Sequence, residues 1–226
     1  DWSSDVCSSD LVASYPQVRA VSITAIPTHL VSDIAFGTYA QNEMLYAKTL
    51  VGRIADHSLT VFDRGFLCAE ILLGLTQGGQ ERHYLIPAKS NTKWEVLSGS
   101  ADDCLVRMRV SPQARAKAPE LPEHWTARAV RMVSANGKQR VLLTSLLDRR
   151  RFKAEALAEC YRRRWEIETS YRELKQSMLG EALTLRSQQP EGIEQEIWGA
   201  LIAYNLVRLE MAKAAIEAKV EPTDLS

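Results

Sequence analysis

The chain has 226 residues, with 28 Lys and Arg against 28 Asp and Glu, so its formal net charge at pH 7 is zero. Hydrophobic residues make up 46% and charged residues 25%, as expected of a soluble globular protein with one domain, or one domain and a large insertion. No apolar run reaches the length of a membrane span, and the four cysteines are scattered without metal-ligand spacing. We therefore expect a reduced, cytoplasmic chain without a membrane segment or a zinc site.

Residues 1–11, DWSSDVCSSDL, differ in character from the rest of the chain. They are low in complexity and resemble the translation of a short-read sequencing adapter. A disordered polar N-terminus is the alternative. We expect these residues to be foreign to the natural protein, and we expect that protein to continue upstream of Val12.

Residues 12–88 alternate between β-rich runs and helical patterns. Asn42 is a plausible cap for the first helix, and Gly78-Gly79 ends the second. The order strand, strand, helix, strand, helix, strand predicts an α/β sheet. The predicted strands cover 18–26, 30–36, 59–62 and 82–87, and the predicted helices cover 42–55 and the Leu-rich stretch before 78.

Residues 89–147 alternate between apolar and polar positions, separated by Gly, Pro and Asn turns. This pattern predicts a β-rich insertion, in which the proline-rich piece 112–122 is a loop. The predicted strands cover 94–97, 104–110, 125–133 and 140–146.

Residues 160–179 have helical periodicity and no Pro or Gly, which predicts one continuous amphipathic helix; a last helix is expected over 193–218. On the helical wheel Tyr161, Arg164 and Lys175 lie within roughly 40° of Glu168, beside a stripe with core-facing spacing. A carboxylate among cations also fits an ordinary solvated face with i,i+4 ion pairs.

Basic residues crowd this region although the whole chain is neutral. Such a local cluster can bind phosphates. Its members are Arg149, Arg150, Arg151, Lys153, Arg162, Arg163, Arg164, Arg172 and Lys175.

Asp63 follows the apolar run 59–62 and precedes Arg64-Gly65. A carboxylate at a strand end, next to a glycine that allows close backbone approach, suits a metal ligand facing a cleft. A turn-forming Asp is the alternative at this position.

The spacing Tyr161-x2-Arg164-x3-Glu168-x6-Lys175 resembles the Tyr-Arg-Glu-Lys signature of the IS-four family of bacterial insertion-sequence transposases. FDRGF around Asp63 resembles the family's second catalytic Asp motif. The resemblance covers about residues 15–215 and implies a ribonuclease-H-like mixed sheet with a β-rich insertion before the catalytic helix. The implied divisions are an adapter-like segment (1–11), the first part of the core (12–88), the insertion (89–147), and the catalytic and C-terminal helices (148–226).

The resemblance implies metal-dependent phosphoryl transfer on double-stranded DNA, that is, strand nicking and strand transfer at transposon ends and target. Asp63 and Glu168 would be two members of an Asp-Asp-Glu triad that holds two Mg²⁺ or Mn²⁺ ions about 3.5–4 Å apart. Arg164 and Lys175 would bind phosphates, and Tyr161 would contact a phosphate or orient Arg164. Self-association in a synaptic complex would also be expected.

The first Asp of the family's triad lies on the first strand of the fold, upstream of the part that matches here. Asp1, Asp5 and Asp10 have no strand around them, and Asp33 is expected to be a polar residue within a strand. We therefore expect the first strand to be missing and the chain as given to be inactive and poorly folded. Two other functions stay open: a catalytically dead DNA-binding remnant that inhibits an intact transposase, and a stand-alone nuclease.

Overall fold

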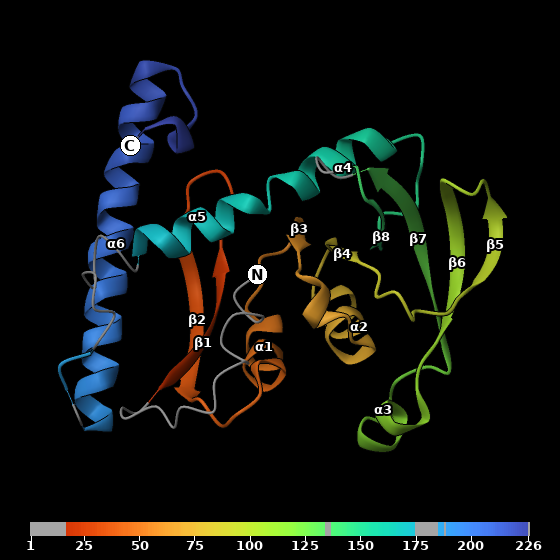
Figure 1. Cartoon of the computed structure of the whole chain (residues 1–226), viewed down its shortest axis with the longest axis horizontal. Coiled ribbons are helices and arrows are strands. Elements are labelled where there is room, and N and C mark those ends of the chain that lie inside the picture. The colour runs from red at the N-terminus through yellow and green to blue at the C-terminus, as the bar shows by residue number, and fades with distance from the viewer. Residues whose placement is uncertain (1–16, 134–136, 175–184, 188, 226) are drawn as a thin grey trace.

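The computed structural model describes residues 17–133, 137–174, 185–187 and 189–225. In this part of the chain the strands form two separate sheets, a two-stranded hairpin and a six-stranded sheet, with helices packed around both (Figure 1). The predicted mixed α/β architecture is confirmed. None of the described helices is long and apolar enough to cross a membrane.

The larger sheet has the strand order β3-β4-β8-β7-β6-β5. Strands β3 and β4 are parallel, and every other neighbouring pair is antiparallel. Because β8 pairs directly with β4, the sheet continues across the predicted boundary between 88 and 89. The strands are β3 (Ser58–Val61), β4 (Arg82–Pro87), β5 (Glu95–Gly99), β6 (Asp103–Arg109), β7 (His124–Val133) and β8 (Gln139–Thr144).

The smaller sheet is an antiparallel hairpin of β1 (Val18–Thr24) and β2 (Val31–Thr38). Helix α1 (Glu43–Val51) follows it and is capped by Asn42, whose side chain accepts a hydrogen bond from the Met44 amide, as the sequence predicts. Asp33 lies within β2, where it pairs with Arg53 at 3.0 Å.

Both faces of the six-stranded sheet are buried, because alternate residues of its central strands enter two different clusters. In β4, Tyr84 and Ile86 pack with α1 and with α2 (Ala69–Gln77). Leu85, between them, faces the opposite side and packs with α4 (Ala154–Arg162). The sheet is therefore the middle layer between helices.

The proline-rich segment predicted as a loop contains a short helix, α3 (Pro112–Lys117), so that prediction was wrong. The Ser111 hydroxyl accepts a hydrogen bond from the Ala114 amide, and Pro112 occupies the first turn, where a missing N–H costs nothing. The residues that follow, Gln-Ala-Arg-Ala-Lys, are good helix formers.

The predicted continuous helix over 160–179 is also wrong. The structure has two helices, α4 and α5 (Trp165–Glu173), joined at Arg163 and Arg164. At the junction the Arg164 amide bonds to the Tyr161 carbonyl at 3.0 Å, an i→i−3 bond that tightens the turn. The cause is tertiary: α4 packs on the six-stranded sheet, whereas α5 contacts the hairpin. Residues 175–184 lie outside the described part.

The last helix, α6 (Pro190–Ala218), confirms the predicted C-terminal helix, and the short η3 (Pro222–Asp224) follows it. Asn205 on α6 donates to the Val31 carbonyl and accepts from the Val31 amide at 2.8 and 2.9 Å. This side chain therefore satisfies the backbone groups of Val31 at the start of β2.

Candidate active site

An open cavity of roughly 3880 Å³ separates the hairpin from the six-stranded sheet. All of β1 lines one side, all of β3 lines the other, and α4 and α5 contribute their junction. The volume is several times the ~300–1,000 Å³ of a typical small-molecule pocket.

Asp63 stands where β3 ends and the short 3-10 helix η1 (Arg64–Phe66) begins. Its side chain accepts a hydrogen bond from the Gly65 amide at 2.9 Å, which fixes the carboxylate at the C-terminal end of β3. Asp63 therefore both stabilises the turn after β3 and lines the cavity, so the two alternatives considered for this residue are compatible.

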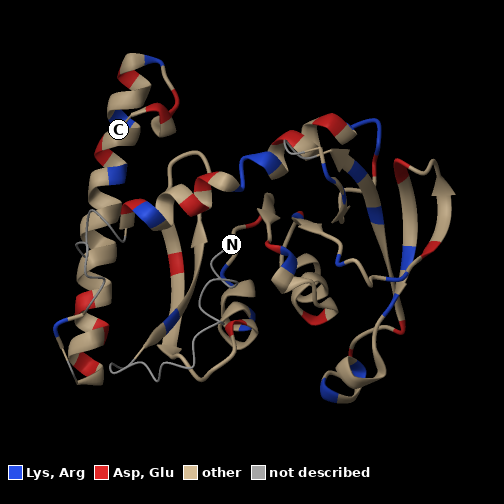
Figure 2. Cartoon of the chain, viewed as in Figure 1, with Lys and Arg blue, Asp and Glu red and all other residues tan. Residues whose placement is uncertain are grey.

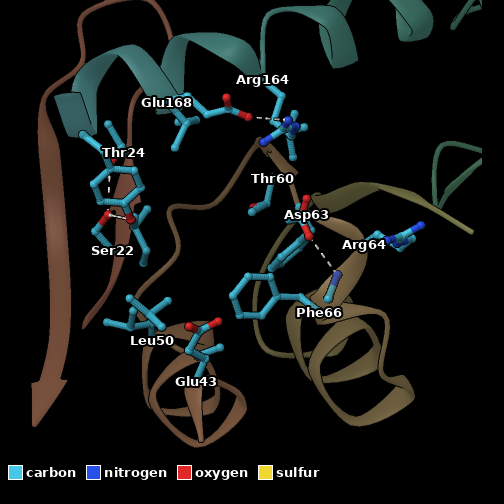
Figure 3. A pocket seen from close by; sticks show the side chains of 18 of the residues that line it. Ser22, Thr24, Glu43, Leu50, Thr60, Asp63, Arg64, Phe66, Arg164 and Glu168 are labelled. Atoms are coloured by element: carbon cyan, nitrogen blue, oxygen red, sulfur yellow. Dashed lines mark hydrogen bonds and ion pairs between the residues drawn. The ribbon is translucent and has the colours of Figure 1, made fainter. Parts of the chain in front are cut away.

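Glu168 projects from α5 into the same cavity, as Figure 3 shows with Asp63 and Arg164. Its Oε1 accepts a hydrogen bond from Arg164 at 2.8 Å, and both side chains are about three-quarters buried. Burial alone would lower the pKa of the Arg164 guanidinium. The hydrogen bond to Glu168, with the nearby Tyr161 and Asp63, nevertheless raises that pKa above its ordinary value, so Arg164 stays charged.

Tyr161 is buried, and the Arg164 guanidinium carbon lies 6.0 Å from the centre of its ring. Burial raises the pKa of the Tyr161 hydroxyl; Arg164 opposes this shift and Asp63 adds to it. Tyr161 therefore remains a neutral phenol at physiological pH, which suits a support for Arg164 better than a covalent nucleophile. The fourth signature residue, Lys175, lies outside the described residues.

Among the charged side chains of the described lining, cations outnumber acids, because only Glu43, Asp63 and Glu168 are acidic. The net charge of zero thus hides a strong local imbalance, part of it visible at the α4–α5 junction above β3 (Figure 2). The cations are Arg19, Arg53, Arg64, Lys89, Arg131, Lys138, Arg140, Arg163, Arg164, Arg172 and Arg186.

The donor chemistry of the site fits a hard cation, because Asp63 and Glu168 offer carboxylate oxygens to one cavity. Within the described residues, however, no three His, Cys, Asp or Glu side chains come close enough together to hold a metal ion. If the two carboxylates bind a metal, they form a partial ligand set, and a further ligand is required.

Sequence reasoning missed part of this lining. Lys89, Lys138 and Arg140 come from the segment predicted as an insertion, and Trp165 is 58% exposed beside Arg164. Arg140 begins the predicted strand 140–146, but alternation in a strand does not show which face lines a cavity. Lys138 precedes that strand, and nothing local distinguishes Trp165.

Comparison with known proteins adds independent findings. The family model described as "Transposase DDE domain" matches residues 9–206. The chain is 41% identical over 208 residues to the protein named "Transposase InsG for insertion sequence element IS4" of Escherichia coli (strain K12), covering 92% of this chain and 47% of that protein. It is 33% identical over 84 residues to "Putative transposase InsZ" of the same strain, covering 37% of this chain and 28% of that protein. The chain thus spans about half the length, or less, of the curated relatives it matches.

Proposed function

The chain belongs to the DDE transposase domain family, and from that premise we propose that it contributes metal-dependent phosphoryl transfer on DNA at insertion-sequence ends. The observation that carries the proposal is the meeting of Asp63 and Glu168, distant in sequence, at one cavity with a cationic lining. The chain matches about half of its IS4 relative, so strand nicking and strand transfer are proposed for a protein that includes this chain.

Each site residue has a proposed role. Asp63 and Glu168 bind Mg²⁺ or Mn²⁺, which would activate the attacking hydroxyl and stabilise the leaving oxygen. Arg164 binds a phosphate oxygen near the scissile bond, because a guanidinium forms two parallel hydrogen bonds to such a group. The Tyr161 ring packs against the Arg164 guanidinium and orients it. Lys175 would add a second cation.

We further propose that the complete fold is ribonuclease-H-like and that one more strand fills the space between β1 and β3. In the described part of the chain, both strands present an edge without a neighbouring strand to the same cavity. An extended segment lies about 4.8 Å from each strand with which it pairs, so one strand could join the two sheets. A carboxylate on that strand would complete the partial ligand set.

The experiment joins the preceding part of the E. coli IS4 relative to this chain and measures Mg²⁺-dependent nicking of DNA that carries transposon ends. Glu168→Gln and Asp63→Asn should each abolish nicking and leave DNA binding nearly intact, because the amide keeps the shape of the side chain but not its charge. The two changes together should cost no more than either one, since metal ligands act as a unit.

Glu159→Gln is the matched control, because Glu159 is also ion-paired on a helix, to Arg162, but does not line the cavity. Nicking by Glu168→Gln within tenfold of the parent would remove Glu168 from the metal site.

A DNA-binding role without cleavage is the second candidate. It is favoured by the contrast between many cations and an incomplete ligand set in the described residues. Addition of this chain to an intact related transposase tests it: inhibition in proportion to the amount added is expected for such a remnant, and unchanged nicking would contradict it.

Self-association is proposed through the outer face of α6. Four exposed apolar side chains recur there at helical spacing, with Lys213 among them: Ile202, Leu206, Leu209 and Ile216. Sedimentation should detect a dimer that Ile202→Glu dissociates, and a parent that is monomeric at every concentration would exclude this face as an interface.

A further inference from the structure

A buried polar cluster lies on the side of α5 away from the candidate active site. His29, in the turn between β1 and β2, is 1% exposed. Its Nδ1 lies 3.2 Å from Glu173 Oε2, and its Nε2 lies 3.2 Å from Glu166 Oε2. One imidazole therefore bridges two carboxylates of the same helix.

The two carboxylates share one face of α5. Seven residues separate Glu166 from Glu173, which returns a helix to within about 20° of its starting direction. Glu168 follows Glu166 by two residues, about 200° around the axis. The bridge therefore holds the face of α5 opposite to the one that directs Glu168 and Arg164 into the cavity.

The C-terminal helix closes the cluster from a third direction. The Tyr204 hydroxyl donates to Glu173 Oε2 at 3.0 Å, and the buried Arg208 guanidinium lies 3.5 Å from the same oxygen. Arg208 Nε also donates to the Thr28 carbonyl at 2.9 Å, next to His29. Hairpin, α5 and α6 thus meet at Glu173.

The bridge uses both ring nitrogens of His29, one toward each carboxylate. Arg208 adds a guanidinium on the Glu173 side of the bridge. His29 also has φ of +60°, a conformation that L side chains rarely adopt and that persists only where the surroundings impose it.

We propose that His29 is a positioning residue: by bridging Glu166 and Glu173 it fixes the rotation of α5 about its axis and so keeps Glu168 and Arg164 facing the cavity. The rigid element is α5 itself, because its backbone transmits the constraint from one face to the other. The role of Glu168 in this inference rests on the proposed function.

The test compares His29→Gln with His57→Gln, each in the chain joined to the preceding part of the IS4 relative, which would supply the further ligand. His57 is the matched control, since it too has positive φ (+54°) and pairs with a glutamate, Glu81 at 2.8 Å, but its side chain is 64% exposed and that glutamate lies outside α5. Mn²⁺ broadening of two NMR signals, the amides of Gly65 beside Asp63 and of Glu168, reports the metal site. Hydrogen exchange of α5 amides in metal-free protein reports the helix.

In the parent and in His57→Gln, both signals should broaden at the same Mn²⁺ concentration. In His29→Gln the Glu168 signal should require about tenfold more Mn²⁺ than the Gly65 signal, as when a supporting residue around a metal site is lost. The α5 amides of that variant should exchange about tenfold faster. If His29→Gln fails to fold, Glu166→Gln, which keeps the His29–Glu173 arm, should change both readouts in the same direction.

Two results would overturn the proposal. Unchanged exchange of α5 would mean that His29 does not hold the helix. Faster exchange with both signals still broadening together would mean that His29 stabilises α5 without positioning Glu168. If Mn²⁺ broadens neither signal in the parent, the metal site of the proposed function is wrong, and α5 exchange alone then decides whether His29 fixes the helix.

Discussion

Arg164 connects the two halves of the candidate site. Its guanidinium packs above the buried Tyr161 ring on α4 and bonds to Glu168 on α5, so one side chain spans the junction of the two helices. Glu168 uses Oε1 for this bond, and a carboxylate has a second oxygen with which to bind a cation.

Tyr84 is a buried residue whose polar atom lacks a role. Among the described residues its hydroxyl has no hydrogen-bond partner, while its ring lies 5.9 Å from that of Trp125. Burial also raises the pKa of this hydroxyl well above its ordinary value. The Tyr84 side chain therefore stabilises the fold by packing, whereas its unpaired hydroxyl lowers the free energy of unfolding.

Tyr84→Phe should leave the free energy of unfolding unchanged or raise it by about 1 kcal/mol, because an unsatisfied buried polar group is removed. Thermal and urea unfolding measure the change. Tyr46→Phe is the control: Tyr46 is also buried, but its hydroxyl donates to the Thr38 carbonyl at 3.2 Å, so this change should lower stability by about 1 kcal/mol. Equal losses in both variants would show that Tyr84 has a partner.

At the scale of elements, the sequence predicted most strands and helices because their signals are local. Strand β4 appears with its predicted bounds, and Asn42 caps α1 as its residue type indicates. The break between α4 and α5 was not predictable in this way, since neither Pro nor Gly marks it. It arises because α4 packs against the six-stranded sheet and α5 against the hairpin. The periodicity of a sequence does not show against which sheet a helix packs.

Gly37 on β2 makes possible the close approach of α1 to the hairpin. A β-carbon at Gly37 would lie 2.5 Å from the Tyr46 hydroxyl oxygen and 3.2 Å from Cζ of the same ring. Gly37→Ala should therefore displace α1 and lower the free energy of unfolding by about 1–3 kcal/mol, as overpacking does elsewhere. Thermal unfolding provides the measurement.

Gly52→Ala is the matched control at the C-terminus of α1. Its φ of −66° is accessible to alanine, and an added β-carbon meets nothing within 4 Å. This variant should be neutral or slightly more stable. A Gly37→Ala protein as stable as Gly52→Ala would show that α1 does not pack on β2 as described.

At the scale of the molecule, the site could be predicted in part. The sequence motifs identified Asp63, Tyr161, Arg164 and Glu168, and the fold brings all four to one cavity. The basic residues on the opposite wall and the His29 bridge depend on contacts between segments far apart in the sequence. Local patterns do not specify such contacts, because they are set by how the sheets and helices pack.

The uneven distribution of charge predicts a salt-dependent affinity for DNA in a chain whose net charge is zero. Arg164→Ala should weaken binding of a short duplex and reduce the slope of log K against log salt by about 0.9, the effect of one lost phosphate contact. Arg107→Ala is the control, because Arg107 pairs with Glu95 on the far strands β5 and β6 and does not line the cavity. Equal slopes for Arg164→Ala and the parent would show that Arg164 does not contact a phosphate and only bonds to Glu168.

The open space between β1 and β3 separates the two sheets, and a strand inserted there would join them into one. Among the described residues, each strand has an edge without a strand partner, so its hydrogen-bonded amides should exchange faster than those of the central strands β4 and β8. When the preceding part of the IS4 relative is joined to the chain, an inserted strand would pair with both edges. Exchange in β1 and β3 should then slow together by about 10–100-fold, since each edge gains hydrogen bonds worth about 1–3 kcal/mol when buried. Strand β6, already paired on both sides, is the internal control and should change by less than about threefold. Protection of β1 without β3, or of neither, would contradict an inserted strand and the ribonuclease-H-like arrangement that depends on it.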